Sequence, residues 1–409
     1  MQQTIAVIAS ADTKHAEMDF IKQVFEREGF RALTIDVSSR GGYSYEADIG
    51  ADAIASAGGS SLQEVFSAND KAGTVAIMQA GATAVVKDLF DQGRIHGILG
   101  LGGLQNSTIA SHSMRQLPIG FPKLILSTVA CGSRPFDLLV GDKDITVMPS
   151  IVDIAGVNPL TRIVLGNAAA AIMGMVRNGG EQLDGSRFLL GATMMGVTND
   201  GVVNAVRLVK QAGYDVVVFH TTGVGGRTME QLITSGGIGA VMDLCLHEIV
   251  SQDVIGGGFS YGAPQRLTAA ARMGIPMVVS PGGLDFVDYP LKDFQSNAIG
   301  DWTRRKYTLH NKEIAHIKLF SHEAEKAAEI AVERLNRHTG KVIAILPLAG
   351  LRSETRLGER LHDPQVDEAI FSVFRKGLKK EIPLVEIDAH FLDEDFSRAA
   401  ADAMLSLLP

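Results

Sequence analysis

One stretch of the chain combines a strand, a glycine-rich turn and the beginning of a helix. Residues 215–220, DVVVFH, have the β-branched and aromatic composition that is typical of a strand. Three glycines follow, at Gly223, Gly225 and Gly226, and residues 228–230 read as the start of a helix. A chain with this order has to turn sharply from a strand into a helix N-terminus, as the units of a parallel α/β sheet do.

The same turn is a candidate binding site. Glycine lets the backbone approach a ligand, and the free N–H groups and the positive end of the helix dipole favour an anion. The alternative is a tight turn in which glycine only supplies positive φ, but the threonine and arginine side chains beside the glycines favour a binding site. We therefore expect a small anionic molecule, carrying a phosphate or a carboxylate, to bind at His220, Thr222, Gly223, Gly225, Gly226 and Arg227.

Strand and helix patterns alternate along the chain, and polar or glycine-rich turns follow the strands. This pattern is typical of a parallel sheet wound on both faces, with ligands outside the carboxyl ends of the strands. The glycine-rich and polar segment 179–186 predicts a domain boundary, after which the order strand, helix, strand starts again. The sequence therefore predicts two tandem doubly wound, Rossmann-like α/β domains, at residues 1–183 and 184–409, with residues 286–312 forming a loop.

Composition excludes several classes of protein. A net charge of −8 without a long basic cluster argues against nucleic acid as a partner. No run of about 18 apolar residues is present, so we expect no membrane contact. Two cysteines, Cys131 and Cys245, cannot build a disulfide framework, which agrees with a reducing compartment. We expect a cytoplasmic protein.

Polar residues gather after the strands of the first domain. The first strand ends before Asp12, Thr13 and Lys14, and a later strand ends in glycines that precede two hydroxyl residues. This glycine run matches neither a dinucleotide fingerprint nor a phosphate-binding loop with its own lysine. Lys14 either supplies the missing cation or is a surface residue. The expected nucleotide-facing residues are Asp12, Thr13, Lys14, Gly102, Gly103, Ser107, Thr108 and Ser127.

Three polar residues alternate near the end of the chain. Glu386, Asp388 and His390 would share one face of a strand, because side chains in a strand alternate between its two faces. This spacing can serve as an acid–base group or bind a divalent cation. It is also typical of a polar strand end whose side chains bond neighbouring loops. We keep these residues as catalytic candidates.

Several separated segments carry a family resemblance and occur in the family's order. They are residues 11–14 (ADTK), 117–120 (LPIG), 127–130 (STVA), 152–156 (VDIAG), 219–223 (FHTTG), 225–227 (GGR) and 386–390 (EIDAH). With these segments the chain resembles the tobamovirus-resistance-protein-like ATP-binding family, in a stand-alone bacterial form without the barrel domain of plant members. The resemblance implies two Rossmann-like domains, ATP as a cofactor with or without magnesium, and a homodimer or larger assembly. It implies no particular reaction.

One glycine loop departs from that family. Where the family usually has Gly-Gly-Ser-Gly-Gly-Thr, residues 102–107 here read GGLQNS. Residues with side chains adopt left-handed backbone conformations poorly, and Gln105 more so than Asn106. We therefore expect weaker ATP binding than in relatives with the intact loop.

Together these observations predict a nucleotide-binding protein that acts as a small-molecule enzyme, with a cleft between its two domains. Two alternatives stay open. One is a nucleotide-independent hydrolase or lyase of a carboxylate or phosphorylated metabolite. The other is a non-catalytic binding or regulatory module.

Overall fold

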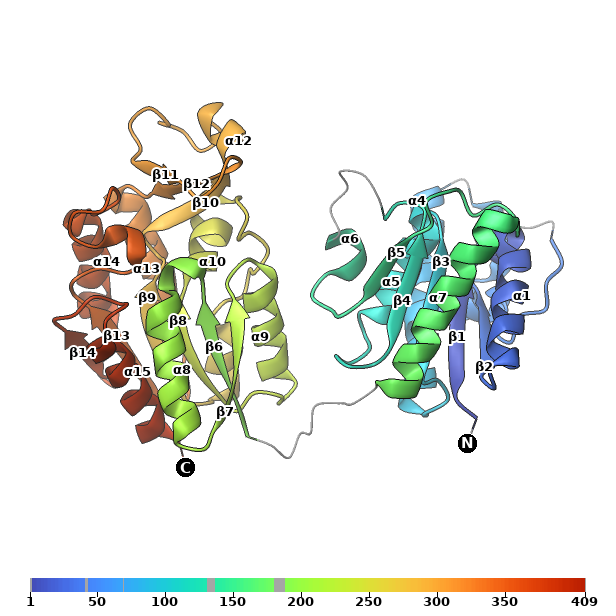
Figure 1. Ribbon diagram of the computed structural model, residues 1–409, viewed down its shortest axis with the longest axis horizontal. Helices are drawn as coiled ribbons and strands as arrows, with labels where there is room; N and C mark the ends of the chain where they lie inside the picture. The colour runs from blue at the N-terminus through green and yellow to red at the C-terminus, as the bar shows by residue number, and fades with distance from the viewer. Residues whose placement is uncertain (1, 41–42, 69, 131–136, 180–187, 409) are drawn as a thin grey trace. The chain divides into compact units, whose positions relative to one another are not determined.

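The computed structural model describes residues 2–40, 43–68, 70–130, 137–179 and 188–408. The chain forms two compact units, residues 1–183 and 184–409 (Figure 1). Cys131, most of the expected boundary segment 179–186, and the residue that follows it lie outside the described residues.

Unit 1 is built on a parallel sheet of five strands in the order β2-β1-β3-β4-β5. Four of its strands are short runs that are almost fully buried, as expected for strands covered on both faces, and the edge strand β5 is partly exposed. Their bounds are β1 (Thr4–Ala9), β2 (Arg31–Asp36), β3 (Gly97–Gly102), β4 (Lys123–Ser127) and β5 (Thr146–Pro149).

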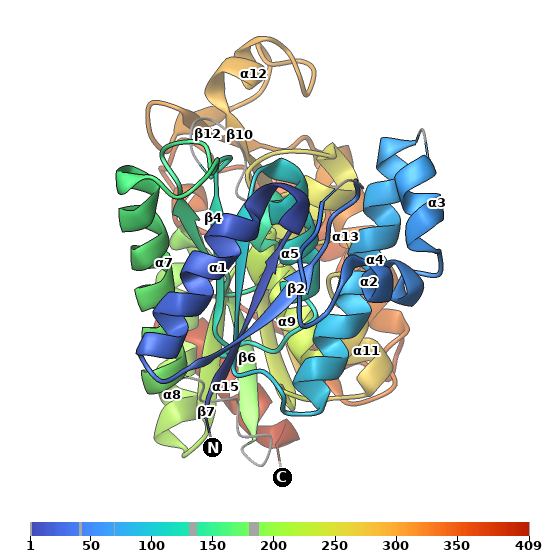
Figure 2. The same ribbon diagram turned by 90° about the vertical axis from the view of Figure 1, so that its right-hand side faces the viewer.

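Helices cover both faces of this sheet, and each face has its own hydrophobic core. One core contains α1 (Ala11–Arg27) and α7 (Pro159–Asn178), and the other contains α2 (Ala51–Ala57), α4 (Lys71–Asp91) and α5 (Leu104–Met114). Figure 2 shows α1 and α7 on one side and α2 and α4 on the other. Two shorter helices complete the unit, α3 (Leu62–Ser67) and α6 (Asp137–Val140).

Of the described helices, α7 alone is long and apolar enough to cross a membrane by length and composition. Its buried residues, among them Leu165, Ala168 and Ile172, pack into the core that α1 shares. This packing is typical of a core helix, which passes the same test of length and composition.

Unit 2 is built on a parallel sheet of six strands in the order β14-β13-β9-β8-β6-β7. The prediction of two doubly wound parallel sheets is thus confirmed. The strand bounds are β6 (Leu189–Met194), β7 (Asp215–His220), β8 (Ala240–Cys245), β9 (Met277–Gly282), β13 (Val342–Pro347) and β14 (Leu384–Ile387).

Two layers of helices again cover the sheet. The helices α8 (Asn199–Gln211) and α15 (Glu394–Leu407) lie on one face, in front of the strands in Figure 1. The other face is covered by α9 (Val224–Thr234), α11 (Thr268–Met273), α13 (Ser321–Asn336) and α14 (Pro364–Gly377). Four short helical turns connect these elements, η1 (Gly196–Thr198), α10 (His247–Ile249), η2 (Val250–Ile255) and η3 (Ser353–Thr355).

The expectation of a loop at residues 286–312 is wrong. This segment opens a small antiparallel sheet in the order β10-β12-β11, with β10 (Phe286–Pro290), β11 (Tyr307–Leu309), β12 (Ile314–Lys318) and the short helix α12 (Leu291–Gln295). The strands have only three to five residues and carry polar side chains, so the alternation of apolar and polar residues that indicates a strand is weak in this segment.

Two of the three glycines in the turn after β7 are required for different reasons. Gly223 has a φ of 83°, and a Cβ atom there would lie 2.2 Å from the carbonyl oxygen of Tyr261. Gly225 lies inside α9 without positive φ, but its Cβ would lie 1.9 Å from the carbonyl oxygen of His220. Positive φ explains one glycine, and close backbone packing explains the other.

Gly225→Ala should therefore destabilise unit 2 by about 1 to 3 kcal/mol, because the added methyl group meets a backbone atom that cannot easily move. Trp302 is the chain's single tryptophan and lies in unit 2, so its fluorescence during urea unfolding reports on this unit. The control is Gly196→Ala, where a Cβ meets nothing within 4 Å. Equal unfolding midpoints for both variants would contradict the packing argument.

Candidate functional site

In unit 1 the first candidate site lies at the topological switch point of the sheet. β1 and β3 are neighbours, but the helices that follow them, α1 and α5, cover opposite faces. In doubly wound sheets ligands bind where the order of strands reverses in this way. The Ser10 hydroxyl donates to Oδ1 of Asn106 over 2.6 Å and so joins the two sides. The expected residues of both turns, 12–14 and 102–103, therefore lie at the same edge.

The N-terminus of α1 is already bound to a carboxylate of the chain. Asp36, at the end of β2, is 2% exposed and its Oδ1 accepts a hydrogen bond from the Ala11 N–H over 2.9 Å. The next N–H group, that of Asp12, donates to the Ser38 hydroxyl over 3.0 Å. Burial raises the pKa of the Asp12 carboxyl, with a smaller contribution from the Asp36 charge. The backbone donors of α1 are thus used internally.

The N-terminus of α5 differs. Its N-cap residue Gly103 carries no side chain, and the first N–H groups, those of Leu104, Gln105 and Asn106, have no hydrogen-bond partner among the described residues. A Cβ atom at Gly103 would meet only the Thr128 hydroxyl, at 3.6 Å. Unpaired donors at the positive end of a helix dipole form an anion site. This turn is the strongest phosphate-binding candidate in unit 1.

The altered loop does not need left-handed backbone where that was expected. Leu104, Gln105 and Asn106 form the first turn of α5, and only Gly102 has positive φ, at 140°. The physical reason given for weaker ATP binding is therefore wrong. Two of the side chains are engaged within unit 1, since Nε2 of Gln105 donates to the Ser39 hydroxyl over 3.0 Å and Asn106 bonds Ser10.

The other expected nucleotide-facing residues occupy different environments. The hydroxyl oxygens of Ser107 and Ser127 lie 2.6 Å apart, and both residues are fully buried. They join α5 to β4. The Thr108 hydroxyl donates to the Leu104 carbonyl of its own helix over 2.8 Å. Lys14 is half-buried, and its ammonium group reaches only the Thr13 carbonyl, at 3.5 Å, among the described residues.

In unit 2 a carboxylate of the chain fills the glycine turn. Oε1 of Glu248 accepts hydrogen bonds from the N–H groups of Gly223 and Gly226, over 2.6 and 3.1 Å. Oε2 accepts from Nε of Arg266 over 2.7 Å, and the two terminal nitrogens of Arg266 bind Asp243 over 2.9 and 2.6 Å. Glu248, Arg266 and Asp243 have no exposed surface. An external anion would have to displace Glu248 from these N–H groups.

The remaining residues of this turn form hydrogen bonds with nearby backbone carbonyl groups. Arg227 donates to the Gly262 carbonyl over 2.6 Å, and Nδ1 of His220 lies 3.2 Å from the Met194 carbonyl. The Thr222 N–H donates to the His220 carbonyl over 2.9 Å. Glu248 and Arg266 were not predicted as site residues from the sequence. The sequence feature that could have indicated Glu248 is its position just after the strand β8, at the carboxyl edge of the sheet.

A further carboxyl group, that of Glu230 on α9, lies at the start of α11. It is 8% exposed, and its Oε2 accepts from the Ala269 N–H over 2.6 Å. Burial raises the pKa of the Glu230 carboxyl to about 7, although the Arg266 charge acts in the opposite direction. Burial likewise raises the pKa of Asp243 and Glu248.

The expectation that Glu386, Asp388 and His390 share one face of a strand is wrong. β14 ends at Ile387, so the last two lie beyond it. Glu386 is exposed and pairs with Nε of Arg375 over 2.5 Å. His390 is 2% exposed, and its Nδ1 accepts from the Leu392 N–H, so Nε2 carries the proton that it donates to the Arg352 carbonyl over 3.1 Å. Among the described residues no group of three His, Cys, Asp or Glu side chains could hold a metal ion.

Glu230→Gln should change how the stability of unit 2 depends on pH. The folded-state pKa of about 7 exceeds the ordinary value of 4.5, so folding favours the proton, and the associated stability is complete below pH 4.5 and is lost as the pH rises through 7. The variant stays neutral and keeps an acceptor for Ala269. Between these limits the wild type should lose on the order of 3 kcal/mol relative to the variant. Parallel stability curves, measured by Trp302 fluorescence in urea, would contradict this assignment.

Comparison with known proteins finds one relative that matches along its whole length and another that matches over part of its length. A UPF0261 protein of Clostridium tetani is 36% identical over 411 residues and covers 100% of both chains. The ToMV resistance protein Tm-1(GCR237) of Solanum lycopersicum is 33% identical over 344 residues, which are 82% of this chain and 44% of the tomato protein. A solved UDP-N-acetylglucosamine 2-epimerase from Rickettsia bellii aligns with 100% of this chain and 96% of its own, at 10% identity and a TM-score of 0.22.

Two family models divide the chain at the same place as the two units. The model of the UPF0261 N-terminal domain matches residues 3–181, and that of the UPF0261 C-terminal domain matches residues 187–408. The chain therefore belongs to the uncharacterised protein family UPF0261 and carries both of its domains.

Proposed function

We propose that unit 1 binds a nucleotide, with ATP as the expected ligand, and that the phosphate groups lie on the first turn of α5. The observation that carries this proposal is the set of unpaired N–H groups at Leu104, Gln105 and Asn106 behind the uncapped Gly103. At α1, α9 and α11 the corresponding donors bind Asp36, Glu248 and Glu230 of the chain itself.

The surroundings of this turn suit a phosphate. The site lies at the switch point between β1 and β3, where doubly wound sheets bind nucleotides. Because Gly103 has no side chain, a phosphate oxygen can approach the backbone. Lys14, in the first turn of α1, would supply a cation from the neighbouring strand end, and Asp12 would be the carboxylate available to a magnesium ion that accompanies ATP.

In this proposal the protein is a cytoplasmic enzyme that acts on a small anionic molecule, with the substrate held by unit 2. The rival hydrolase or lyase reading has less support, because Glu386 is paired with Arg375 and His390 is held by backbone groups on both ring nitrogens. The tomato relative is named for resistance to a virus, which keeps the role of a binding module as the second alternative.

Gly103→Asp should abolish or strongly weaken ATP binding. An aspartate at the N-cap would accept hydrogen bonds from the same N–H groups and place a negative charge where the phosphate lies. Gly103 has a φ of −84°, so an aspartate fits its backbone. We expect affinity to fall about ten- to hundredfold in calorimetry, without loss of thermal stability.

The matched control is Gly103→Ala, which adds a methyl group but neither a charge nor an acceptor. Its affinity should stay within about threefold of the wild type, since the methyl group has ordinary contact distances. If the aspartate variant binds ATP as tightly as the alanine variant, the phosphates do not lie on α5.

We also propose that the chain forms a homodimer or a larger assembly. Ala168 and Ala169, two small residues of α7, are buried inside unit 1 and so offer no surface to a second copy. Leu160 and Ile163 on the same helix are 43% and 60% exposed and offer an apolar surface instead. Light scattering at micromolar concentration should give at least twice the monomer mass, and a monomeric mass would contradict the proposal.

A further inference from the structure

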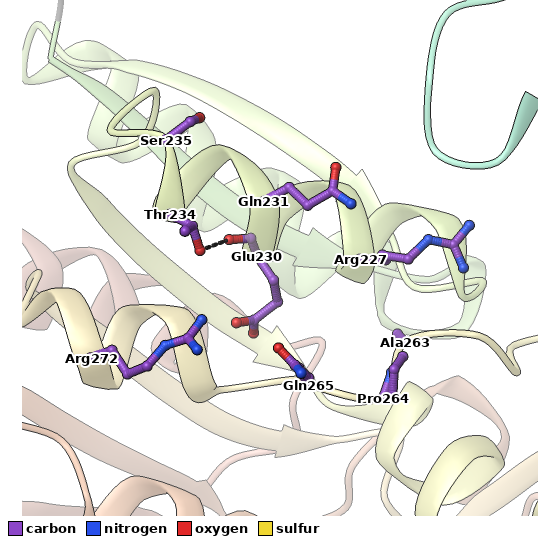
Figure 3. Close-up of a pocket in the computed structure, with 9 residues that line it drawn as sticks. All are labelled: Arg227, Glu230, Gln231, Thr234, Ser235, Ala263, Pro264, Gln265 and Arg272. Atoms are coloured by element: carbon purple, nitrogen blue, oxygen red, sulfur yellow. Dashed lines mark hydrogen bonds between the residues drawn. The ribbon is translucent and has the colours of Figure 1, made fainter. Parts of the chain in front are cut away.

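A groove of about 470 Å³ runs between α9 and α11 on one face of unit 2 (Figure 3). This volume lies within the range of roughly 300 to 1,000 Å³ that is typical of small-molecule sites. The groove belongs to unit 2 and the first turn of α5 belongs to unit 1, so a ligand in the groove is independent of a nucleotide on α5. Its walls come from residues 227–235 of the α9 segment and from residues 263–272.

The deepest polar group of the groove is the Glu230 carboxyl. Its Oε2 is fixed by the Ala269 N–H, and the residue is more than nine-tenths buried. In Figure 3 the Glu230 carboxyl and the Gln265 amide point into the space between the two helices. Ala263, which is 1% exposed, adds an apolar wall beside them. A group bound here would be held against a fixed carboxyl.

Two arginines stand at the ends of the groove. Arg227 is fixed by the Gly262 carbonyl at 2.6 Å. Arg272 is exposed, makes no hydrogen bond or ion pair with the described residues, and extends its guanidinium toward the space between the helices in Figure 3. Because Glu230 is the single carboxyl among the lining residues, the groove carries more positive than negative groups. Arginine binds the oxygens of carboxylates and phosphates with two parallel donors.

We propose that this groove binds a small molecule that carries a carboxylate or phosphate group and a hydroxyl group, with Arg272 binding the anion and Glu230 bonding the hydroxyl. The shared chemistry is an oxyanion, and either acid type supplies it. The site lies beside the glycine turn but uses side chains of the groove, because Glu248 already occupies the N–H groups of that turn.

The test is a calorimetric titration of the full-length protein with two probes, L-malate and glycerol 3-phosphate, at constant ionic strength set with chloride. We expect at least one probe to bind the wild type. The variant Arg272→Ala should weaken that binding about ten- to hundredfold, as expected for the loss of a charge-assisted contact. The variant Arg272→Lys should bind with intermediate affinity, because it keeps the charge but loses the second donor.

The matched control is Arg207→Ala, which removes another exposed helical arginine, on α8 and on the opposite face of the sheet. Its affinity for the probe should equal that of the wild type. Trp302 fluorescence in urea verifies that all variants are folded. The proposal is overturned if neither probe binds the wild type at millimolar concentration, or if Arg272→Ala binds as tightly as Arg207→Ala. The probe that binds identifies the acid type.

Discussion

The buried guanidinium of Arg266 organises unit 2. Its two terminal nitrogens bind Asp243 of β8, and its Nε binds Glu248, which accepts from the N–H groups at the start of α9. Arg266 itself lies just before α11, so one side chain connects a strand with the starts of α9 and α11. All three charged groups are excluded from water, and an unpaired charge in such a buried position would cost several kcal/mol. Since Arg266 fixes Glu248, it also decides that the glycine turn at α9 is filled by the chain itself.

The same arrangement recurs at other helix starts. Asp36 binds the first N–H of α1, and Glu230 binds an N–H of α11, so a carboxylate takes the place that a bound anion would occupy. Such a carboxylate stabilises the helix and occupies the N–H groups that would otherwise bind an external anion. The first turn of α5 has no such partner among the described residues and lies at the switch point of the sheet, so a bound phosphate would gain hydrogen bonds there.

Much of the fold could be predicted from sequence, because buried parallel strands read as short apolar runs between helical patterns. The turn at residues 220–227 was also found, since glycines at a strand end have few other uses. Its occupant was not, because Glu248 lies 25 residues from Gly223 and no local pattern links them. The prediction that residues 386, 388 and 390 share one face was wrong for a simpler reason. Alternate residues share a face only within a strand, and β14 ends at Ile387.

Hydrogen exchange of the whole chain with and without ATP tests most directly whether phosphate binds at the first turn of α5, where the N–H groups have no partner among the described residues. Unbonded N–H groups exchange readily and are protected when a ligand accepts their hydrogen bonds. The account predicts slower exchange for residues 103–107 when ATP is added and unchanged exchange for residues 222–227, where the N–H groups of Gly223 and Gly226 already bind Glu248. Protection of residues 222–227 without protection of residues 103–107 would contradict it.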